Sequence, residues 1–271
     1  MPQYSSISTR ILCAAVSVLA CCAAGPLPPN ALTAAEMRDG WTLLFDGKSM
    51  VGWDDSRLKT PPGDAWTIED GCLKATARPR ITEDLFTMGA FRDFELEFDW
   101  RISPGGNSGV KYRIQDHRFV MPSKGTFEQS VEHSFQHPVS QRLARGQDYV
   151  IGFEYQVIDN SDVRNSPKQT AGALYDMVAP SAQAARPVGE FNHSRILVRG
   201  NHVEHWMNGV KVVDTALDSP EALAGIKTRW GIAPHVYELL ATQPTKDCPI
   251  SLQNHGADAW FRNIKIRTLA R

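Results

Sequence analysis

Short segments in which apolar and polar residues alternate recur along this chain from about Trp41 onward. The clearest covers residues 94–101, where Phe, Leu, Phe and Trp share one face and charged side chains share the other. Alternation with a period of two is typical of a β-strand that buries one face. Because no long stretch of helical periodicity interrupts these segments, the sequence predicts an all-β fold.

Turn sequences separate the expected strands. The sequence PGGN at residues 104–107 lies between the strand at 94–101 and an alternating run at 110–114, which predicts a hairpin. Asn208 and Gly209 predict a second hairpin. The other predicted strands cover residues 195–199, 203–207, 210–214, 250–253 and 260–267, and the last two lie on either side of Gly256. A short helix is expected over residues 220–223, with Ser219 as its N-cap. Such strand spacing indicates a β-sandwich.

Composition and charge narrow the function. The 271 residues are 42% hydrophobic, which is enough for one main domain with a sizeable core. With 29 basic and 30 acidic residues and no run of Lys or Arg, the chain lacks the concentrated positive charge of a nucleic-acid or membrane surface.

The first 24 residues have the pattern of a secretory signal peptide. Arg10 precedes an apolar stretch at residues 11–24 that is too short to span a bilayer, and small residues and prolines follow at 25–29. We expect cleavage after Ala24, a linker at 25–39, a domain at 40–271 and a soluble periplasmic or extracellular product. The sequence VLAC ending at Cys21 offers the alternative of a lipoprotein.

Two cysteines, Cys72 and Cys248, remain after the expected cleavage. In an oxidising compartment they could pair, although nothing in the sequence shows that they meet. Their separation does not match a zinc site.

The strand FEYQVIDN at residues 153–160 offers polar groups on one surface. Alternation places Phe153, Tyr155 and Val157 toward a core, whereas Glu154 and Gln156 face the other way, and Asp159 and Asn160 close the strand. Carboxylate and amide groups suit a ligand with many hydroxyls. The alternative is an ordinary strand with one solvent-exposed face.

A long connection at residues 117–147 interrupts the alternation and holds His117, His133 and His137. Long ordered loops are often lids or binding loops, and the alternative is an insertion without chemistry. The three histidines lack the spacing of a metal site.

Eight segments of the chain follow one another in a specific order and spacing: GWTLLFDGKSMVGW at 40–53, WTIEDG at 66–71, DFELEFDWRISPGGNSGVKYR at 93–113, FEYQVIDN at 153–160, AGALYD at 171–176, GEFN at 189–192, VEHWMNGVKVVD at 203–214 and ISLQNHGADAWFRNIKIR at 250–267. Taken together, these segments resemble the 3-keto-disaccharide hydrolase family. The resemblance implies a concanavalin A-like β-sandwich, or jelly roll, of two antiparallel sheets. Phe191 stands where the family usually has Trp, and the connection at 115–151 is longer than expected.

The resemblance also implies a carbohydrate substrate whose sugar carries a ketone at carbon 3. Such a ketone acidifies the proton on carbon 2, so elimination across carbons 1 and 2 can break the glycosidic bond and water can then add. This route avoids the pair of opposed carboxylates that ordinary glycosidases use. It requires a base near carbon 2, a donor at the ketone oxygen and an acid for the departing oxygen.

We assign these roles to residues of the matching segments. Glu154 is the expected base, His255 and His205 are candidates for the acid, and Arg113 is expected to stabilise the enolate oxygen. The expected sugar contacts are Asn107, Ser108, Gln156, Asp159, Tyr175, Asp176, Asn192 and Gln253, with Trp206 as a second ring that could stack on a sugar. Arg262 is expected to be structural.

Three points stay open at this stage. No cofactor is certain, but Glu154, Asp159, Asp176 and His255 could together hold a divalent cation. A non-catalytic carbohydrate-binding domain is the alternative function, because fold does not decide function. An ordinary glycosidase is disfavoured because no strand carries paired carboxylates of the ExDxE type.

Overall fold

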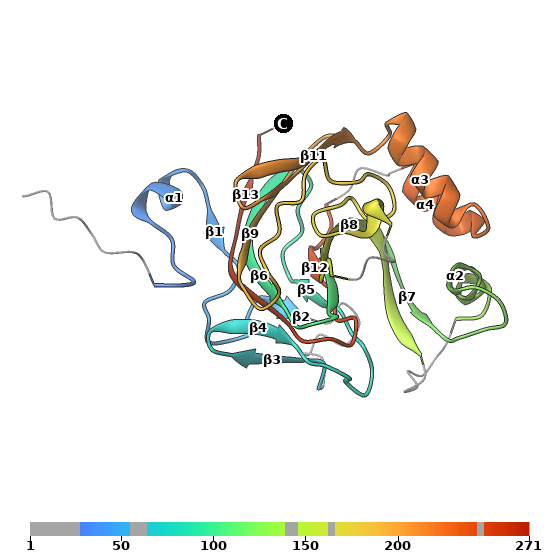
Figure 1. Ribbon diagram of the computed structural model, residues 1–271, viewed down its shortest axis with the longest axis horizontal. Helices are drawn as coiled ribbons and strands as arrows, with labels where there is room; N and C mark the ends of the chain where they lie inside the picture. The colour runs from blue at the N-terminus through green and yellow to red at the C-terminus, as the bar shows by residue number, and fades with distance from the viewer. Residues whose placement is uncertain (1–27, 55–63, 139–145, 162–165, 243–246, 271) are drawn as a thin grey trace, which may run out of the picture.

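A computed structural model describes residues 28–54, 64–138, 146–161, 166–242 and 247–270, so the predicted signal peptide at 1–24 lies outside the described residues. Its strands form two antiparallel sheets that pack face to face, which confirms the predicted β-sandwich (Figure 1). None of the described helices has both the length and the hydropathy that crossing a bilayer requires.

The larger sheet, sheet A, has the strand order β11-β10-β9-β6-β13-β4-β3, and β1 pairs with β13 outside this path. Its strands are β1 (Thr42–Leu43), β3 (Trp66–Glu69), β4 (Cys72–Ala75), β6 (Phe94–Ile102), β9 (Asn192–Arg199), β10 (His202–Met207), β11 (Val210–Ala216) and β13 (Ala259–Thr268). Sheet B has the order β2-β5-β12-β7-β8. Its strands are β2 (Trp53–Asp54), β5 (Leu85–Thr87), β7 (Asn107–Val120), β8 (Gln147–Ile158) and β12 (Ser251–Leu252).

The core lies between the two sheets and follows the predicted alternation. Phe98 of β6 and Tyr155 of β8 meet edge to face with ring centroids 5.5 Å apart, a geometry that aromatic rings favour. Phe153 and Val157 are fully buried on the same face of β8. Consequently the side chains of Glu154 and Gln156 extend from the opposite face of sheet B, away from sheet A.

Two buried polar groups link the sheets through the core. The hydroxyl of Ser194 on β9 bonds the Trp100 indole N–H at 2.8 Å and the Tyr155 hydroxyl at 2.7 Å. His205 on β10 has no exposed surface and donates from Nδ1 to the Gly172 carbonyl at 2.9 Å. Its Nε2 therefore accepts a hydrogen bond from the Tyr112 hydroxyl at 2.8 Å. Burial lowers the pKa of His205 to about 4, so the ring is neutral near neutral pH.

The structure corrects one predicted hairpin and confirms the other. The turn after β6 leads to β7 in sheet B, so these consecutive strands lie in different sheets and do not pair. β12 and β13 are likewise in different sheets. In contrast, β10 and β11 pair around Asn208 and Gly209, whose φ angles of 49° and 84° suit the type I′ turn of a two-residue hairpin.

The segment predicted as a long connection at 117–147 is partly regular. β7 continues to Val120, helix α2 (Phe127–Gln136) follows, and β8 begins at Gln147, with residues 139–145 outside the described part. Thr126 and Gln129 form a capping box at the start of α2. The expected short helix after Ser219 is longer than predicted: α3 (Pro220–Trp230) is followed by α4 (Pro234–Thr242). Together, α2, α3 and α4 lie on the side of the sandwich opposite α1 (Ala34–Arg38) (Figure 1).

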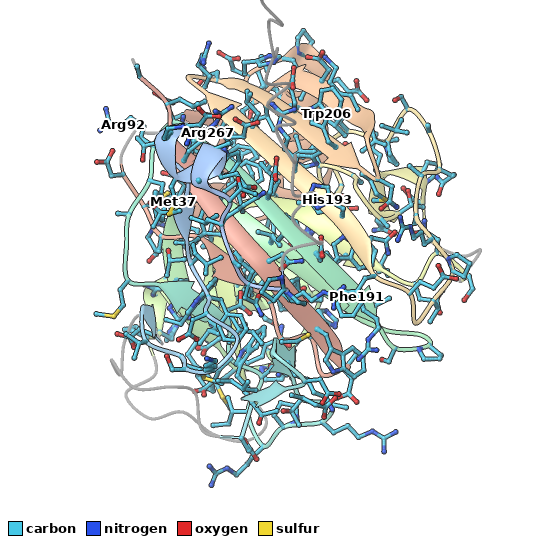
Figure 2. All side chains as sticks on the ribbon, turned by 90° about the vertical axis from the view of Figure 1, so that its left-hand side faces the viewer. Met37, Arg92, Phe191, His193, Trp206 and Arg267 are labelled. Atoms are coloured by element: carbon cyan, nitrogen blue, oxygen red, sulfur yellow. The ribbon has the colours of Figure 1, made fainter. Side chains whose placement is uncertain are left out.

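The outer face of sheet A carries charged and aromatic side chains, among them His193 and Trp206 (Figure 2). Glu95 on this face pairs with both Arg195 and Arg267. Arg262 pairs with Asp99 at 3.6 Å, in line with the structural role expected for it.

Cys72 and Cys248 are both buried free thiols, so the disulfide considered from the sequence is absent.

His205→Leu tests the role of the buried imidazole. The change leaves the Tyr112 hydroxyl and the Gly172 carbonyl without their partner, so we expect the free energy of unfolding to fall by about 2 kcal/mol. Urea unfolding at pH 7 measures the loss. His202→Leu, an exposed position on the same strand, is the control and should change stability by less than about 0.5 kcal/mol. Equal losses in the two variants would contradict a structural role for His205.

Candidate functional site

A cavity of about 190 Å³ lies on the face of sheet B that is turned away from the core. Six of the residues predicted from the sequence line it: Asn107, Glu154, Gln156, Tyr175, Gln253 and His255. Its wall also includes Asp84, Asp148, Tyr149 and Arg229, which the sequence analysis did not single out. The cavity therefore brings together the expected base and one expected acid.

Glu154 lies at the centre of this arrangement, directly opposite Lys111 in the β7–β8 ladder. Burial of its carboxylate raises the pKa of Glu154 to about 7. The positive charges of Lys111 and Arg229 oppose this rise, whereas the negative charges nearby add to it. A carboxylate with a pKa near neutrality can both take and return a proton under physiological conditions.

Lys111 is almost completely buried and forms an ion pair with Asp84, with 3.4 Å between Nζ and Oδ2. Its ammonium also lies 5.0 Å from the centre of the Tyr149 ring. Burial alone would lower the pKa of Lys111, but the carboxylates of Asp84 and Glu154 raise it overall. Lys111 therefore supplies a permanent positive charge beneath the cavity.

Arg229 reaches the cavity from the last turn of α3. Its Nη1 donates to Oδ2 of Asp176 at 2.8 Å, and the guanidinium lies 4.7 Å from the centre of the Tyr175 ring. Its Nε forms an ion pair with Glu128, 3.9 Å from Oε1, and has no hydrogen-bond partner among the described residues. Burial by itself would lower the pKa of Arg229, but Tyr149, Tyr175 and Asp176 raise it, so the charge is fixed.

The packing of α3 explains how this arginine is positioned. Ser219 caps the helix by accepting from the Ala222 N–H at 3.2 Å. Gly225 lies against Met177, where a Cβ atom would come within 2.6 Å of the Met177 Cα. The missing side chain lets α3 approach the loop that carries Asp176, and so sets the distance between Arg229 and its carboxylate partner.

His255 lies at the rim of the cavity with an exposed side chain. Partial desolvation and the positive charge of Lys111 lower the pKa of His255. No other histidine of the described ranges lines this cavity. The imidazole is therefore available for proton transfer at the place where a ligand would extend into solvent.

Two side-chain amides present acceptors to the cavity. The Nε2 of Gln156 donates to the Oδ1 of Asn107 at 3.2 Å, which leaves the Gln156 Oε1 free to accept. The buried Oε1 atoms of Gln156 and Gln253 have no hydrogen-bond partner within the part of the chain that the structure describes. A ligand with hydroxyl donors would satisfy both.

Two residues predicted to be catalytic lie elsewhere. His205 is in the core between the sheets, so its assignment as the acid is corrected. Arg113 was expected on the face of Lys111, but a bulge interrupts the β7–β8 register between Tyr112 and Asp116, and Arg113 itself has a φ angle of 50°. Its guanidinium bonds Asp93 at 3.1 Å and the Gly200 carbonyl at 2.7 Å, outside the cavity.

Several predicted sugar contacts are also elsewhere. The Ser108 hydroxyl donates to the Gln253 carbonyl at 2.7 Å, and Asp176 holds Arg229 without itself lining the cavity. Asp159 and Asn192 line a different cavity; Asp159 accepts from the backbone N–H groups of two turn residues. Trp206 lies on the outer face of sheet A.

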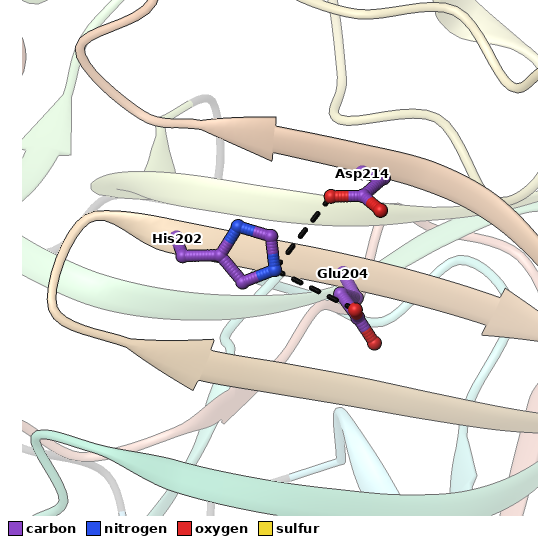
Figure 3. Close-up of side chains that lie close together, drawn as sticks. All are labelled: His202, Glu204 and Asp214. Atoms are coloured by element: carbon purple, nitrogen blue, oxygen red, sulfur yellow. Dashed lines mark ion pairs between the residues drawn. The ribbon is translucent and has the colours of Figure 1, made fainter.

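The four proposed cation ligands are not brought together. Among the described residues, the group of at least three acidic or imidazole side chains that lie close enough to hold an ion is His202, Glu204 and Asp214, on β10 and β11 (Figure 3). The ammonium of Lys211 already pairs with both carboxylates of this group. The geometry therefore gives no support to a cation at Glu154.

Comparison with known proteins places this geometry in a family. A family model described as a 3-keto-alpha-glucoside-1,2-lyase-like domain matches residues 40–267. A 3-keto-disaccharide hydrolase from Bacteroides thetaiotaomicron is 32% identical to this chain, in an alignment that covers 89% of this chain and 85% of that protein.

Solved structures agree with the fold. A crystal structure of a candidate glycosyl hydrolase from Parabacteroides distasonis has a TM-score of 0.66 at 26% identity and covers 90% of this chain and 100% of that one. A second from the same organism has a TM-score of 0.58 at 24% identity, with 84% and 99% covered, and supports the fold alone. Because the family model spans most of the sequence, the chain belongs to the 3-keto-alpha-glucoside-1,2-lyase-like family.

Proposed function

We propose that this protein cleaves the glycosidic bond of 3-keto-glycosides by elimination across carbons 1 and 2 followed by hydration. The observation that carries the proposal is the Glu154 carboxylate, which has a pKa of about 7 in a cavity lined by hydrogen-bonding groups. Family membership and the name of the Bacteroides relative support the substrate class.

In the first step Glu154 takes the proton from carbon 2 of the sugar. The electron pair left behind is delocalised onto the ketone oxygen at carbon 3, which becomes an enolate. Arg229, whose charge is fixed and whose guanidinium lines the cavity, stabilises that oxygen in the role first assigned to Arg113. The charge is held in advance by Asp176, so little reorganisation is needed during the reaction.

In the second step the enolate collapses, the bond from carbon 1 to the departing oxygen breaks, and a double bond forms between carbons 1 and 2. His255 gives a proton to the departing oxygen; its lowered pKa makes its charged form a stronger acid. Water then adds to carbon 1, His255 recovers a proton from it, and Glu154 returns its proton to carbon 2. The sum is hydrolysis of the glycosidic bond.

The remaining polar groups bind the sugar. Gln156 and Gln253 accept hydrogen bonds from hydroxyls through oxygens that are otherwise unpaired among the described residues. Tyr175 offers a ring beside Arg229 on which an apolar sugar face can lie. Asn107 holds the Gln156 amide in the orientation that presents its oxygen.

We further propose that the chain is exported, on the support of the apolar stretch at residues 11–24 and the small residues after it. The full chain would be expressed in a bacterial host with two membranes, followed by fractionation and intact-mass measurement. We expect a soluble periplasmic product that begins at Gly25. A product with a lipid on Cys21 would support the lipoprotein alternative, and an unprocessed cytoplasmic chain would contradict export.

Glu154→Gln tests the base. The amide cannot take a proton, so we expect cleavage of a 3-keto-disaccharide to fall by at least about 10³-fold. The kcat/KM of the unchanged protein should follow a bell-shaped pH profile, because the active form needs Glu154 without its proton and His255 with its proton. A coupled assay for released sugar measures both, with the unoxidised disaccharide as control substrate. Full activity of the variant would remove Glu154 from this role. Calorimetric binding without turnover by the unchanged protein would favour a carbohydrate-binding module instead.

The same variant predicts a change in stability that needs no substrate. Because the pKa of Glu154 is raised in the fold from 4.5 to about 7, the folded state binds more protons than the unfolded state between these values. The unchanged protein therefore loses stability as pH rises through this window. At pH 8 the free energy of unfolding of Glu154→Gln, measured in urea, should exceed that of the unchanged protein by about 2 kcal/mol, allowing for the partial exposure of the side chain. At pH 4 the two should be almost equal. Glu190→Gln, an exposed position, should show no such pH-dependent gain.

A further inference from the structure

Gly109 lies on β7, on the cavity face and directly opposite Gln156 of β8. A Cβ atom built on this glycine would lie 2.2 Å from Oε1, 2.7 Å from Cδ and 2.8 Å from Cγ of Glu154. These separations are shorter than any real contact between such atoms. The Glu154 side chain therefore crosses the β7 backbone diagonally and occupies the space that a side chain at position 109 would need.

Backbone conformation does not explain this glycine. Its φ angle lies outside the left-handed region, so other residues could adopt the same conformation. Glycine in the middle of a strand also reduces stability, because it loses more conformational freedom on folding and packs no side chain. The position therefore serves the close approach of the Glu154 carboxylate.

The charge around the carboxylate depends on this approach. Lys111, the next cavity-facing residue of β7, lies opposite Glu154, and its ammonium pairs with Asp84. Five other charged or titratable groups act on Glu154: Arg229 from α3, Asp176 and Tyr175 from the loop before it, Asp84 from the segment before β5, and Tyr149 from β8. Displacing the carboxylate changes its distance to all of them.

We propose that Gly109 is a positioning residue for Glu154: its missing side chain seats the carboxylate against β7, between Lys111 and the cavity. The inference rests on the proposed function for its catalytic consequence, but the seating itself is a statement about structure. The three atoms nearest to an added methyl group all belong to the flexible side chain of Glu154, so we expect alanine at position 109 to move the carboxylate and leave the sheet intact. Misplacing a reacting group by about 1 Å can cost about 10²-fold in rate.

Gly109→Ala is the central variant, and Gly89→Ala is its control, an exposed glycine whose added Cβ would touch only the Phe91 ring. With a 3-keto-disaccharide as substrate, we expect kcat of Gly109→Ala to fall by about 10- to 100-fold with a smaller change in KM. The midpoint of its pH profile should also move, since the carboxylate has new neighbours. Gly89→Ala should change neither. An unchanged kcat and pH midpoint in Gly109→Ala would overturn the proposal.

A stability cycle tests the seating without any activity. In the unchanged protein Gly109→Ala should lower Tm by about 2–4 °C, because the Glu154 side chain must leave its place. In a Glu154→Ala background the obstruction is gone, so the same change should leave Tm unchanged or raise it. Equal Tm changes in the two backgrounds would overturn the proposal. If the protein cleaves no 3-keto-glycoside yet the cycle shows coupling, the proposed function fails and the seating of Glu154 stands.

Discussion

The antiparallel pairing of β7 with β8 is the interaction on which both the fold and the cavity depend. One face of this ladder contributes Tyr112, Phe153 and Tyr155 to the core, and its other face presents Lys111 and Glu154 to the cavity. Because side chains alternate strictly along a strand, a slip by one residue would bury the charges and expose the aromatic rings. The core therefore fixes the register, and the register fixes which groups meet in the cavity.

The buried charged groups of the cavity lower the stability of the fold, and the packing of the rest of the sandwich offsets this loss. Burial holds Glu154 at a pKa of about 7, and the ion pair of Lys111 with Asp84 is removed from water as well. Such groups reduce stability when they are charged, and the aromatic contacts between the sheets offset the loss. The hydrogen bonds of Ser194 and His205 keep the polar atoms inside the core satisfied.

Local sequence patterns predicted the strands and turns whose structure depends on residues close together in the sequence. The alternation of residues 153–157 located Glu154 and Gln156, and Asn208 with Gly209 located a hairpin. On β10, alternation likewise places His205 on the same face as the buried Val203 and Met207, so the sequence could have predicted its position in the core. Three other features depend on tertiary packing, which no local pattern contains. They are the bulge that turns Arg113 away, the crossing from β6 to β7, and the position of Arg229 and Asp84, from distant segments, in the cavity wall.

The β7–β8 pair and the segment with α2 that connects its two strands contribute different parts of the cavity. The paired strands carry Glu154, the proposed base, whereas Phe127 of α2, at the far tip of the hairpin, forms part of the cavity wall. A hairpin tip can change in length or composition without altering the register of the strands below it. Under the proposed function, natural variation or engineering at this tip can therefore change which attached group the cavity accepts, while the strands that carry Glu154 keep their register.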